Sequence, residues 1–305
     1  MFYLETKDVV KQYGSHTALS GVSIQVPKGS VYGLLGPNGA GKSSLIRIIN
    51  RITAPDSGQV FLNGKESVAD DVFNIGYLPE ERGLYKKMKV GEHIIFLAKL
   101  RGLSNEDAIK KTDLWLKKFD IINWKDKKVE ELSKGMQQKI QFIATVIHEP
   151  YLYILDEPFS GFDPVNAELL KNELLDLKAK GKTIILSTHN MESVEELCDE
   201  ISLINKSKVV LQGNVKEIRA RYRKYIFKLQ VAGESFKMKS PHFSILSQTI
   251  INNVTEVRIQ RNDDASNSEI IQEIAKQYEV MTFEEELPSM NDIFIQVVSK
   301  PQTEQ

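Results

Sequence analysis

Residues 36–44 of this chain read Gly36-Pro37-Asn38-Gly39-Ala40-Gly41-Lys42-Ser43-Ser44. They fit the pattern of a glycine, four residues, and then Gly-Lys-Ser that cradles phosphate groups. The apolar run 30–35 predicts a buried strand entering this loop, and residues 45–49 predict a helix leaving it. Glycines let the backbone aim several N–H groups at one anion, and a helix N-terminus adds partial positive charge. The sequence therefore predicts a phosphate-binding loop.

Two side chains of the loop have expected roles toward a bound nucleotide. Lys42 would reach the β- and γ-phosphates, and Ser43 would be a ligand of Mg²⁺. The alternative is a glycine-rich turn that merely precedes a helix. The flanking strand and helix disfavour it, because they supply the context that the motif requires.

Composition places the chain among soluble globular proteins of about two domains, since it has 305 residues, of which 41% are hydrophobic and 27% charged. Its 40 basic and 41 acidic residues are balanced, so no nucleic-acid partner is expected. The single cysteine, Cys198, excludes an intrachain disulfide and is typical of a reducing compartment. Neither a signal peptide nor a run of about 18 apolar residues is present, so no membrane span is expected.

The distribution of apolar residues divides the chain into segments of different character. Residues 1–28 alternate as antiparallel strands do, and residues 88–149 have helical periodicity. The lysines of this insertion predict a solvated face: Lys110, Lys111, Lys117, Lys118, Lys125, Lys127 and Lys128. Residues 151–155 and 183–187 predict buried strands, with a helix over 168–180 between them. Alternating strands and helices indicate a largely parallel α/β sheet.

The pattern changes again after Gly213. A basic connector over 216–228 leads into a strand over 225–231, and a further strand is predicted over 254–259. Amphipathic helices are predicted over 268–278 and 288–298. Residues 225–305 are thus predicted to form a small α+β domain without a catalytic motif of its own.

Acidic residues and a histidine follow the two buried strands. Asp156 and Glu157 come at the carboxyl end of the first strand, where ligands bind in open α/β sheets. Asp156 is expected to hold Mg²⁺, and Glu157 to orient or deprotonate an attacking water. His189 follows the second strand, beside the expected position of the γ-phosphate. Earlier in the chain, Ser133 predicts the N-cap of an apolar helix.

These pieces, in this order, resemble the ATP-binding subunits of ABC transporters over residues 1 to about 218. Residues 36–44 and 152–157 match the two Walker motifs, and residues 132–136 match the signature sequence. By this resemblance Tyr13 stacks on adenine, Glu80 is a ligand of Mg²⁺, and His189 is the switch histidine. Ser133 and Gly135 of the signature contact nucleotide, as does Asp163 of the sequence Ser160-Gly161-Phe162-Asp163.

Two positions depart from the family pattern. Glutamine is usual where this chain has Glu80, and a carboxylate cannot donate a hydrogen bond as an amide does. The usual signature, Leu-Ser-Gly-Gly-Gln, reads Leu-Ser-Lys-Gly-Met here, so Met136 replaces a polar side chain. The C-terminal extension is similar to that of bacterial export ATPases of the sodium-extrusion type.

The resemblance implies a P-loop NTPase core of the ABC ATPase type with an antiparallel β subdomain and a helical insertion. We expect the nucleotide-binding domain over residues 1–218, with its insertion at about 88–149, and an accessory domain over 219–305. The implied protein is an ATPase that uses ATP and Mg²⁺ and pairs with a second nucleotide-binding subunit. It is expected to power export through a separate permease from the cytoplasmic face of the membrane.

Two other functions are open. The first is a soluble ABC ATPase that acts on nucleic acid, ribosomes or protein assemblies. Such proteins typically carry two nucleotide domains in one chain or a long coiled coil, and this sequence has neither. The second is a regulatory module that binds nucleotide without hydrolysis, which the sequence Asp156-Glu157 and His189 disfavour.

Overall fold

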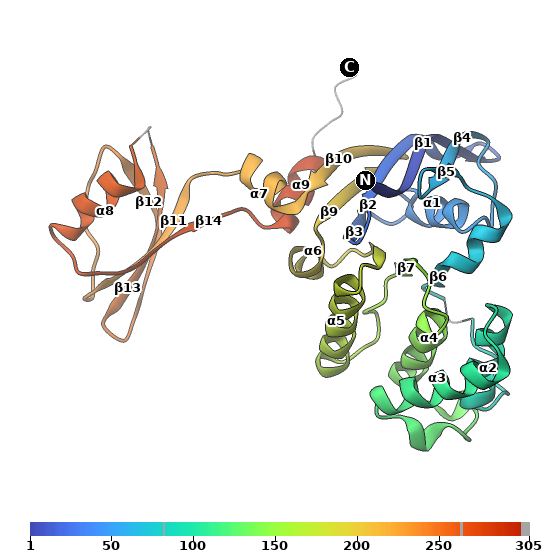
Figure 1. Ribbon diagram of the computed structural model, residues 1–305. Coiled ribbons are helices and arrows are strands. Elements are labelled where there is room, and N and C mark those ends of the chain that lie inside the picture. Colours follow the sequence, from blue (N-terminus) through green and yellow to red (C-terminus); the bar gives the residue numbers. More distant parts are fainter. Residues whose placement is uncertain (82, 263–264, 300–305) are drawn as a thin grey trace. The chain divides into compact units, whose positions relative to one another are not determined.

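The computed structural model describes residues 1–81, 83–262 and 265–299 (Figure 1). The chain divides into two compact units, Met1–Val215 and Lys216–Gln305. This division lies close to the boundary expected after residue 218. That each unit is an independent domain stays a prediction.

A six-stranded sheet with the order β10-β9-β3-β8-β7-β6 forms the centre of the first unit. The strands are β3 (Val31–Leu35), β6 (Ile75–Leu78), β7 (Leu152–Asp156), β8 (Thr183–Ser187), β9 (Glu200–Asn205) and β10 (Lys208–Asn214). All neighbours are parallel except β9 and β10. Every residue of β3, β7 and β8 is buried, as their continuous apolar runs predict. Parallel pairing brings the carboxyl ends of these three strands to one edge.

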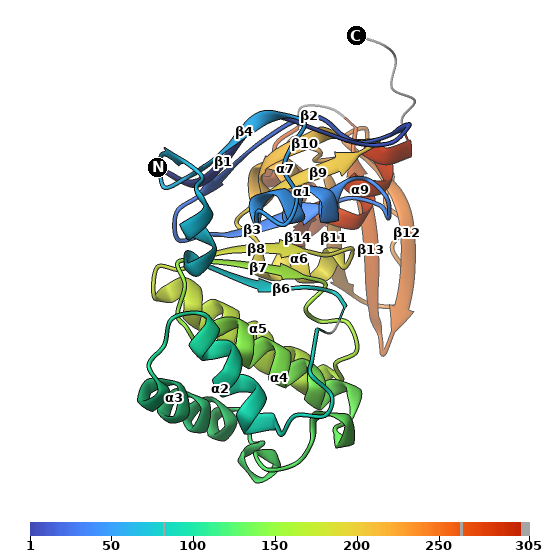
Figure 2. The ribbon, with the colours of Figure 1, turned by 90° about the vertical axis from the view of Figure 1, so that its right-hand side faces the viewer.

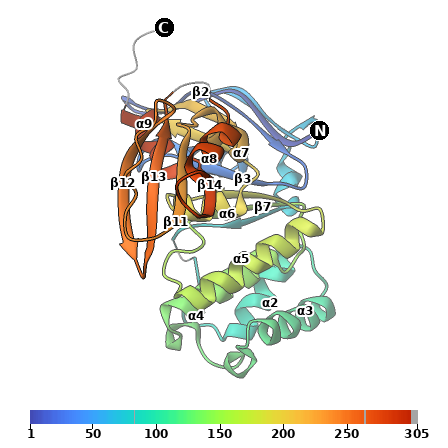
Figure 3. The ribbon, with the colours of Figure 1, turned by 90° about the vertical axis from the view of Figure 1, so that its left-hand side faces the viewer.

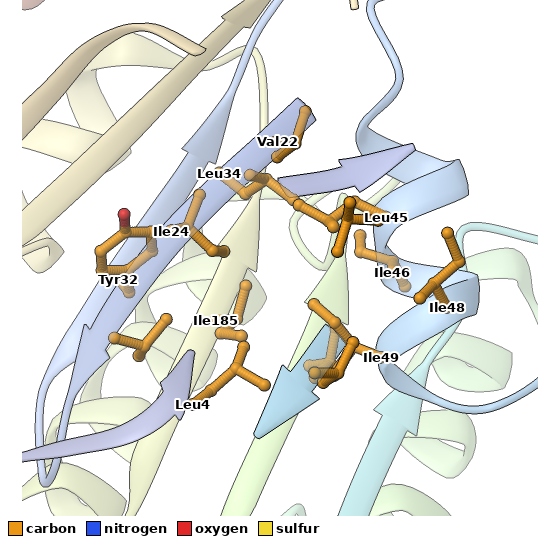
Figure 4. Close-up of a cluster of buried hydrophobic side chains, with 14 of the residues drawn as sticks. Leu4, Val22, Ile24, Tyr32, Leu34, Leu45, Ile46, Ile48, Ile49 and Ile185 are labelled. Carbon is orange, nitrogen blue, oxygen red and sulfur yellow. The ribbon is translucent and has the colours of Figure 1, made fainter. Parts of the chain in front are cut away.

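A second sheet in this unit is antiparallel, with the order β2-β1-β4-β5. Its strands are β1 (Phe2–Tyr13), β2 (His16–Pro27), β4 (Ser57–Leu62) and β5 (Lys65–Glu66). Figure 4 shows its apolar side chains, among them Leu4 and Ile24, against α1 (Lys42–Ile49) and the central sheet. The helix contributes Leu45, Ile46, Ile48 and Ile49 to this core. The two sheets thereby hold α1, and with it the phosphate loop, from both sides (Figure 2).

The insertion is helical, as predicted, with α2 (Val90–Leu100), α3 (Asn105–Lys118) and α4 (Lys134–Val146). Two further helices follow the insertion, α5 (Pro164–Ala179) and α6 (Met191–Leu197). The first unit also has three short 3₁₀ helices, η1 (Ala69–Asn74), η2 (Ile122–Trp124) and η3 (Val129–Glu131). Lys118 of the predicted solvated lysine face is exposed and is also paired. Its ammonium contacts the carboxylate of Glu173 on α5, and Glu173 is only 3% exposed. An ion pair therefore joins α3 to α5.

The second unit contains α7 (Val215–Arg221), β11 (Ile226–Ala232), β12 (Phe243–Ile251), β13 (Val254–Arg261), α8 (Asn267–Ala275), β14 (Val280–Glu286) and α9 (Met290–Ser299). Its four strands form an antiparallel sheet with the order β12-β13-β11-β14 (Figure 3). Ile270 and Ile274 of α8 share a buried core with Phe227, Leu229 and Val257 of the sheet. This unit is an α+β fold with its own core, as expected.

The structure differs from the predicted elements in a few places. The hairpin of β1 and β2 extends up to Tyr13 and His16, and α5 begins at Pro164 rather than at residue 168. Strands β5, β9, β10, β12 and β14 were not predicted. No helix in the described parts of the chain has the length and apolar character needed to cross a membrane.

Candidate functional site

A cleft of about 260 Å³ lies at the carboxyl edge of β3, β7 and β8. It is lined by residues from five places in the sequence: Tyr13, His16, Ala18, Asn38, Gly39, Gly41, Lys42, Ser43, Ser44, Glu80, Asp156, Glu157 and His189. Eleven of these thirteen were predicted site residues. The parallel sheet explains the convergence, because β3, β7 and β8 are neighbours although they are far apart in the sequence.

The phosphate loop can be built only with glycine at two positions. Gly36 has a φ of +149°, and a Cβ there would lie 2.2 Å from the carbonyl oxygen of Ile204. Gly41 has a φ of +116°, and a Cβ there would lie 2.3 Å from the carbonyl oxygen of Ala18. The loop is therefore seated directly on the backbone of β2 and β9, which fixes the start of α1.

Lys42 is folded back onto its own loop. Its Nζ donates to the carbonyl oxygens of Gly36, at 2.7 Å, and Pro37, at 3.2 Å, and the residue is only 9% exposed. Burial lowers the pKa of Lys42, and the carboxylates of Glu157, Asp156 and Glu80 partly offset this effect. The ammonium is thus held at the floor of the cleft, where it can meet phosphate oxygens.

Two carboxylates and a hydroxyl in the cleft suit a magnesium ion. Asp156 is 6% exposed, and burial raises its pKa, with the charges of Glu80 and Glu157 adding to the rise. Ser43 and Glu80 line the same cleft. Carboxylate and hydroxyl oxygens are the hard ligands that Mg²⁺ prefers, and a divalent cation would relieve the repulsion among the acids. The residues present therefore fit Mg²⁺ together with phosphate oxygens.

Glu157 is held by the segment that follows β8. Its backbone has a φ of +48°, and its N–H donates to the carbonyl oxygen of Ser187 at 2.8 Å. The Oε1 atom accepts from the backbone N–H of His189 at 3.0 Å and lies 2.7 Å from His189 Nδ1. Thr188 Oγ1 donates to Oε2 at 3.2 Å. Because a carboxylate only accepts, Nδ1 carries the hydrogen of the His189 ring in this contact.

Sequence reasoning missed two residues that line the cleft, His16 and Ala18. Tyr13 and His16 are paired across the turn between β1 and β2, so their side chains lie on the same face of the hairpin. The sequence does contain a signal, since Gly14 follows Tyr13 and glycine is typical of a turn. The residue opposite Tyr13 could have been inferred had the strands been extended up to that turn.

Six predicted nucleotide contacts do not line this cleft in the described chain. Gly36, Pro37 and Ala40 belong to the phosphate loop itself, whereas Ser133, Gly135 and Asp163 lie elsewhere. Ser133 caps α4, with its Oγ accepting from Met136 N at 3.3 Å. Asp163 caps α5 by accepting from Asn166 N at 2.9 Å. A Cβ on Gly135 would lie 3.9 Å from the carbonyl oxygen of Gly161, so the signature and the segment 160–163 are neighbours. They form a second location, apart from the cleft.

Known proteins share both units of this chain. The ABC transporter family model matches residues 19–160, and the model for the C-terminal domain of DrrA1-3-like ATP-binding proteins matches residues 213–298. The ABC transporter ATP-binding protein YhaQ of Bacillus subtilis is 41% identical over 95% of this chain and 96% of its own length. The linearmycin resistance ATP-binding protein LnrL of Bacillus subtilis is 33% identical, over 86% and 85%.

A solved ATP-binding subunit of an ABC transporter superposes with a TM-score of 0.67 at 32% identity, over 72% of this chain and 93% of its own. The family matches, the identity to YhaQ over nearly the whole chain, and the shared fold agree with one another. The chain therefore belongs to the ATP-binding proteins of ABC transporters, as an ABC transporter ATPase with a DrrA1-3-like C-terminal domain.

Proposed function

We propose that this chain binds ATP with Mg²⁺ in the cleft and hydrolyses it to power a separate membrane permease, in the direction of export. The observation that carries the proposal is the convergence of Lys42, Asp156 and Glu157 with His189 at one edge of the central sheet. A cation for phosphate, acids for a metal, and a held carboxylate beside a histidine together suit phosphoryl transfer to water.

Each residue of the cleft has a distinct role in this proposal. Tyr13 stacks on the adenine, and the backbone N–H groups of residues 36–44 surround the phosphates. Ser43, Asp156 and Glu80 hold Mg²⁺, which neutralises charge on the phosphate oxygens when bound. Glu157 positions a water molecule and accepts its proton, and His189 fixes the carboxylate and lies ready to stabilise charge at the γ-phosphate.

A second copy of the nucleotide-binding unit completes the site. Ser133, Gly135 and Asp163 lie away from the cleft of their own chain, on exposed starts of α4 and α5. In a head-to-tail pair, the N–H groups at the start of α4 of one copy would contact the phosphates held by the other copy. Binding of ATP then joins the nucleotide-binding units of the two copies, and hydrolysis releases them from each other.

A groove beside Glu80 suits the permease. It has a volume of about 540 Å³, and its lining includes Tyr77 and Pro79 on the segment before Glu80, Leu97 of α2, and Arg101 and His148, which follow α2 and α4. A permease segment seated there would contact the loop that carries Glu80, so it would sense the nucleotide. The position implies attachment to the inner face of the membrane. Similarity to a protein named for linearmycin resistance favours export.

Replacement of Glu157 tests the proposal. Glu157→Gln keeps the shape of the side chain and removes the base, so we expect ATP binding to persist while hydrolysis falls by roughly 10²–10⁴-fold. Binding of a fluorescent ATP analogue and steady-state phosphate release measure the two effects. Lys42→Ala is the matched comparison, because it should lose binding as well as turnover. Turnover near wild type in Glu157→Gln would falsify the assignment and favour a module that does not depend on this carboxylate.

A further inference from the structure

The C-terminal sheet has one edge strand without protection. Among the described residues β12 pairs only with β13, so the outer N–H and C=O groups of β12 face away from the sheet (Figure 3). Of its nine residues only Phe243 is buried. The apolar side chains Ile245, Leu246, Ile250 and Ile251 are between 38% and 59% exposed. Such an exposed apolar edge is a template for pairing with another strand.

The opposite edge of the same sheet is protected. Strand β14 ends in three acids, Glu284, Glu285 and Glu286. Two of them are paired within the unit, Glu285 with Arg223 at 2.8 Å and Glu286 with Arg258 at 2.8 Å. Charges on an edge strand oppose pairing with a further strand. Strand β12 has no charged residue at all, so the sheet is closed to partners at β14 and open at β12.

The sequence of β12 is symmetric in its chemistry about Gln248. Residues 245–251 read Ile-Leu-Ser-Gln-Thr-Ile-Ile. An antiparallel pair of two such strands, with a two-fold axis at Gln248, places Leu246 opposite Ile250 and Ser247 opposite Thr249. Gln248 then meets its own copy. Apolar residues oppose apolar ones, hydroxyls oppose hydroxyls, and no like charges meet, which is the pairing that stabilises antiparallel strands.

The backbone of β12 is suited to such a pairing. A register shift against β13 lies between Ile245 and Ser247, so the regular part of the strand begins at Ser247. Residues 247–251 pair with β13 without interruption, so their outer hydrogen-bonding groups are regularly spaced. Isologous contact about a two-fold axis is the common way in which identical chains assemble.

We propose that β12 binds β12 of a second copy of this chain, in antiparallel register about Gln248, and so joins two four-stranded sheets into one. This contact goes beyond the nucleotide-driven pairing proposed above, because it involves neither ATP nor the segments around Ser133 and Asp163. It would hold two chains together before ATP binds and after it is hydrolysed. The nucleotide-binding units would then meet at a high effective concentration.

The self-association of the full chain without nucleotide tests the contact. We expect the wild type to form dimers in analytical ultracentrifugation. Gln248→Lys places two lysines face to face at the axis and should weaken dimerisation roughly tenfold or more. Gln248 is exposed, so the variant should fold normally. Met281→Lys is the matched control, because Met281 is 56% exposed on β14, the other edge, and this variant should dimerise like the wild type.

Cysteine cross-linking tests the register. Gln248→Cys should form a disulfide between chains under mild oxidation without nucleotide. Thr249→Cys alone should not form this disulfide, because residue 249 of one copy lies opposite Ser247 of the other. The double variant Ser247→Cys/Thr249→Cys should form it. The native Cys198 does not interfere, since it is buried and burial raises its pKa to about 12. Cross-linking of Thr249→Cys but not of Gln248→Cys would overturn the register.

A wild-type chain that stays monomeric without nucleotide at every concentration would overturn the contact, as would unchanged dimerisation of Gln248→Lys. Binding of β12 to a permease instead would appear as a monomeric free chain whose assembly with the permease is weakened by Gln248→Lys, and this too would overturn it. ATP binding is measured on the same samples. A chain that dimerises through β12 but does not bind ATP would support the contact and contradict the proposed function.

Discussion

Gly39 and Gly41 lie two residues apart in the phosphate loop, yet their surroundings differ. Gly39 has a φ of +77°, and a Cβ there would meet no atom within 4 Å. Gly41 would place its Cβ 2.3 Å from the carbonyl oxygen of Ala18. Gly39→Ala should therefore lower the free energy of unfolding by about 1–2 kcal/mol through its backbone conformation alone. Gly41→Ala should cost roughly 3 kcal/mol or more, because the loop must also leave β2.

Urea denaturation without nucleotide measures this difference. A fluorescent ATP analogue should still bind to Gly39→Ala, though more weakly, and should not bind to Gly41→Ala. Equal stability of the two variants would show that the loop is not fixed by its contact with β2.

Asp156 illustrates a residue kept for function at the expense of stability. Its folded-state pKa is raised, mainly by burial, so the folded chain binds this proton more tightly than the unfolded chain does. The wild type is therefore favoured at low pH and loses stability as the pH rises from 3.8 through the folded pKa. Asp156→Asn removes the buried charge, so at neutral pH and without Mg²⁺ it should melt at a higher temperature than the wild type while losing hydrolysis.

The pH dependence checks the cause. The melting temperature of Asp156→Asn should exceed that of the wild type by an amount that grows as the pH rises from 3.8 through the folded pKa of Asp156. Above that pKa the difference should stay level, because the Asp156 carboxylate of the wild type is then fully ionised. Asp163→Asn is a control with the same chemical change, at an exposed helix N-cap that asparagine also serves. An advantage that does not depend on pH would rule out the buried charge as its source.

A residue of the site could be predicted from the sequence where the residues next to it in the chain form a recognisable pattern. The sequence Asp156-Glu157 follows a continuous apolar run, and Lys42 lies in a glycine pattern, so both have local signals. The signal for His16 is only indirect, because its place in the cleft depends on pairing with Tyr13 across a turn. The hydrogen bonds from Lys42 Nζ to the carbonyl oxygens of Gly36 and Pro37 could not be predicted either, because they depend on the conformation of the loop.

At the scale of helices, the ion pair between Lys118 on α3 and Glu173 on α5 joins the insertion to the central sheet layer. Glu173 is buried and Lys118 is its charged partner. Lys118→Ala should lower the free energy of unfolding by about 3 kcal/mol, because it leaves a buried carboxylate unpaired. Lys118→Ala/Glu173→Gln should recover most of that loss, because the buried group is then neutral.

Chemical denaturation of the two variants measures the pair, with Lys117→Ala as the control. Lys117 is the exposed neighbour of Lys118 on the same helix, so its replacement should change the free energy of unfolding by less than about 0.5 kcal/mol. If both lysine variants behave alike, the pair contributes no more than a solvated charge.

Elements were predictable where burial imposes a pattern. The strands β3, β7 and β8 are buried throughout and read as continuous apolar runs, and α4 and α8 have apolar faces at helical spacing. Strand β12 is exposed on nearly every residue, so it shows no alternation. Strand β14 ends in three acids, which are uncommon in strands, and it is held by its pairing with β11 and by Arg223 and Arg258.

At the scale of the molecule, the division into two units predicts that the first folds alone. The core of the second unit is formed by its own strands and α8, and Arg219 and Arg223 have their partners Pro288 and Glu285 within that unit. A chain that ends after Arg223 should therefore stay soluble and bind a fluorescent ATP analogue. It should also lose dimerisation without nucleotide, because β12 is removed.

Limited proteolysis of the full chain should cut first near residues 221–225, between α7 and β11. Insoluble protein, or loss of nucleotide binding on truncation, would show that the second unit belongs to the core fold. Retained dimerisation without nucleotide would instead point to a contact elsewhere in the first unit.

The span of the cleft along the chain has a consequence for biosynthesis. Its residues run from Tyr13 to His189, so no nascent chain can hold ATP until β8 and the segment after it have left the ribosome. The strand β12 begins at Phe243, which translation reaches roughly 3–11 s later at 5–20 residues per second. A newly made chain thus has a complete nucleotide site before it has β12, and cellular ATP can act on each chain as a ligand that favours folding before the contact between two β12 strands can form.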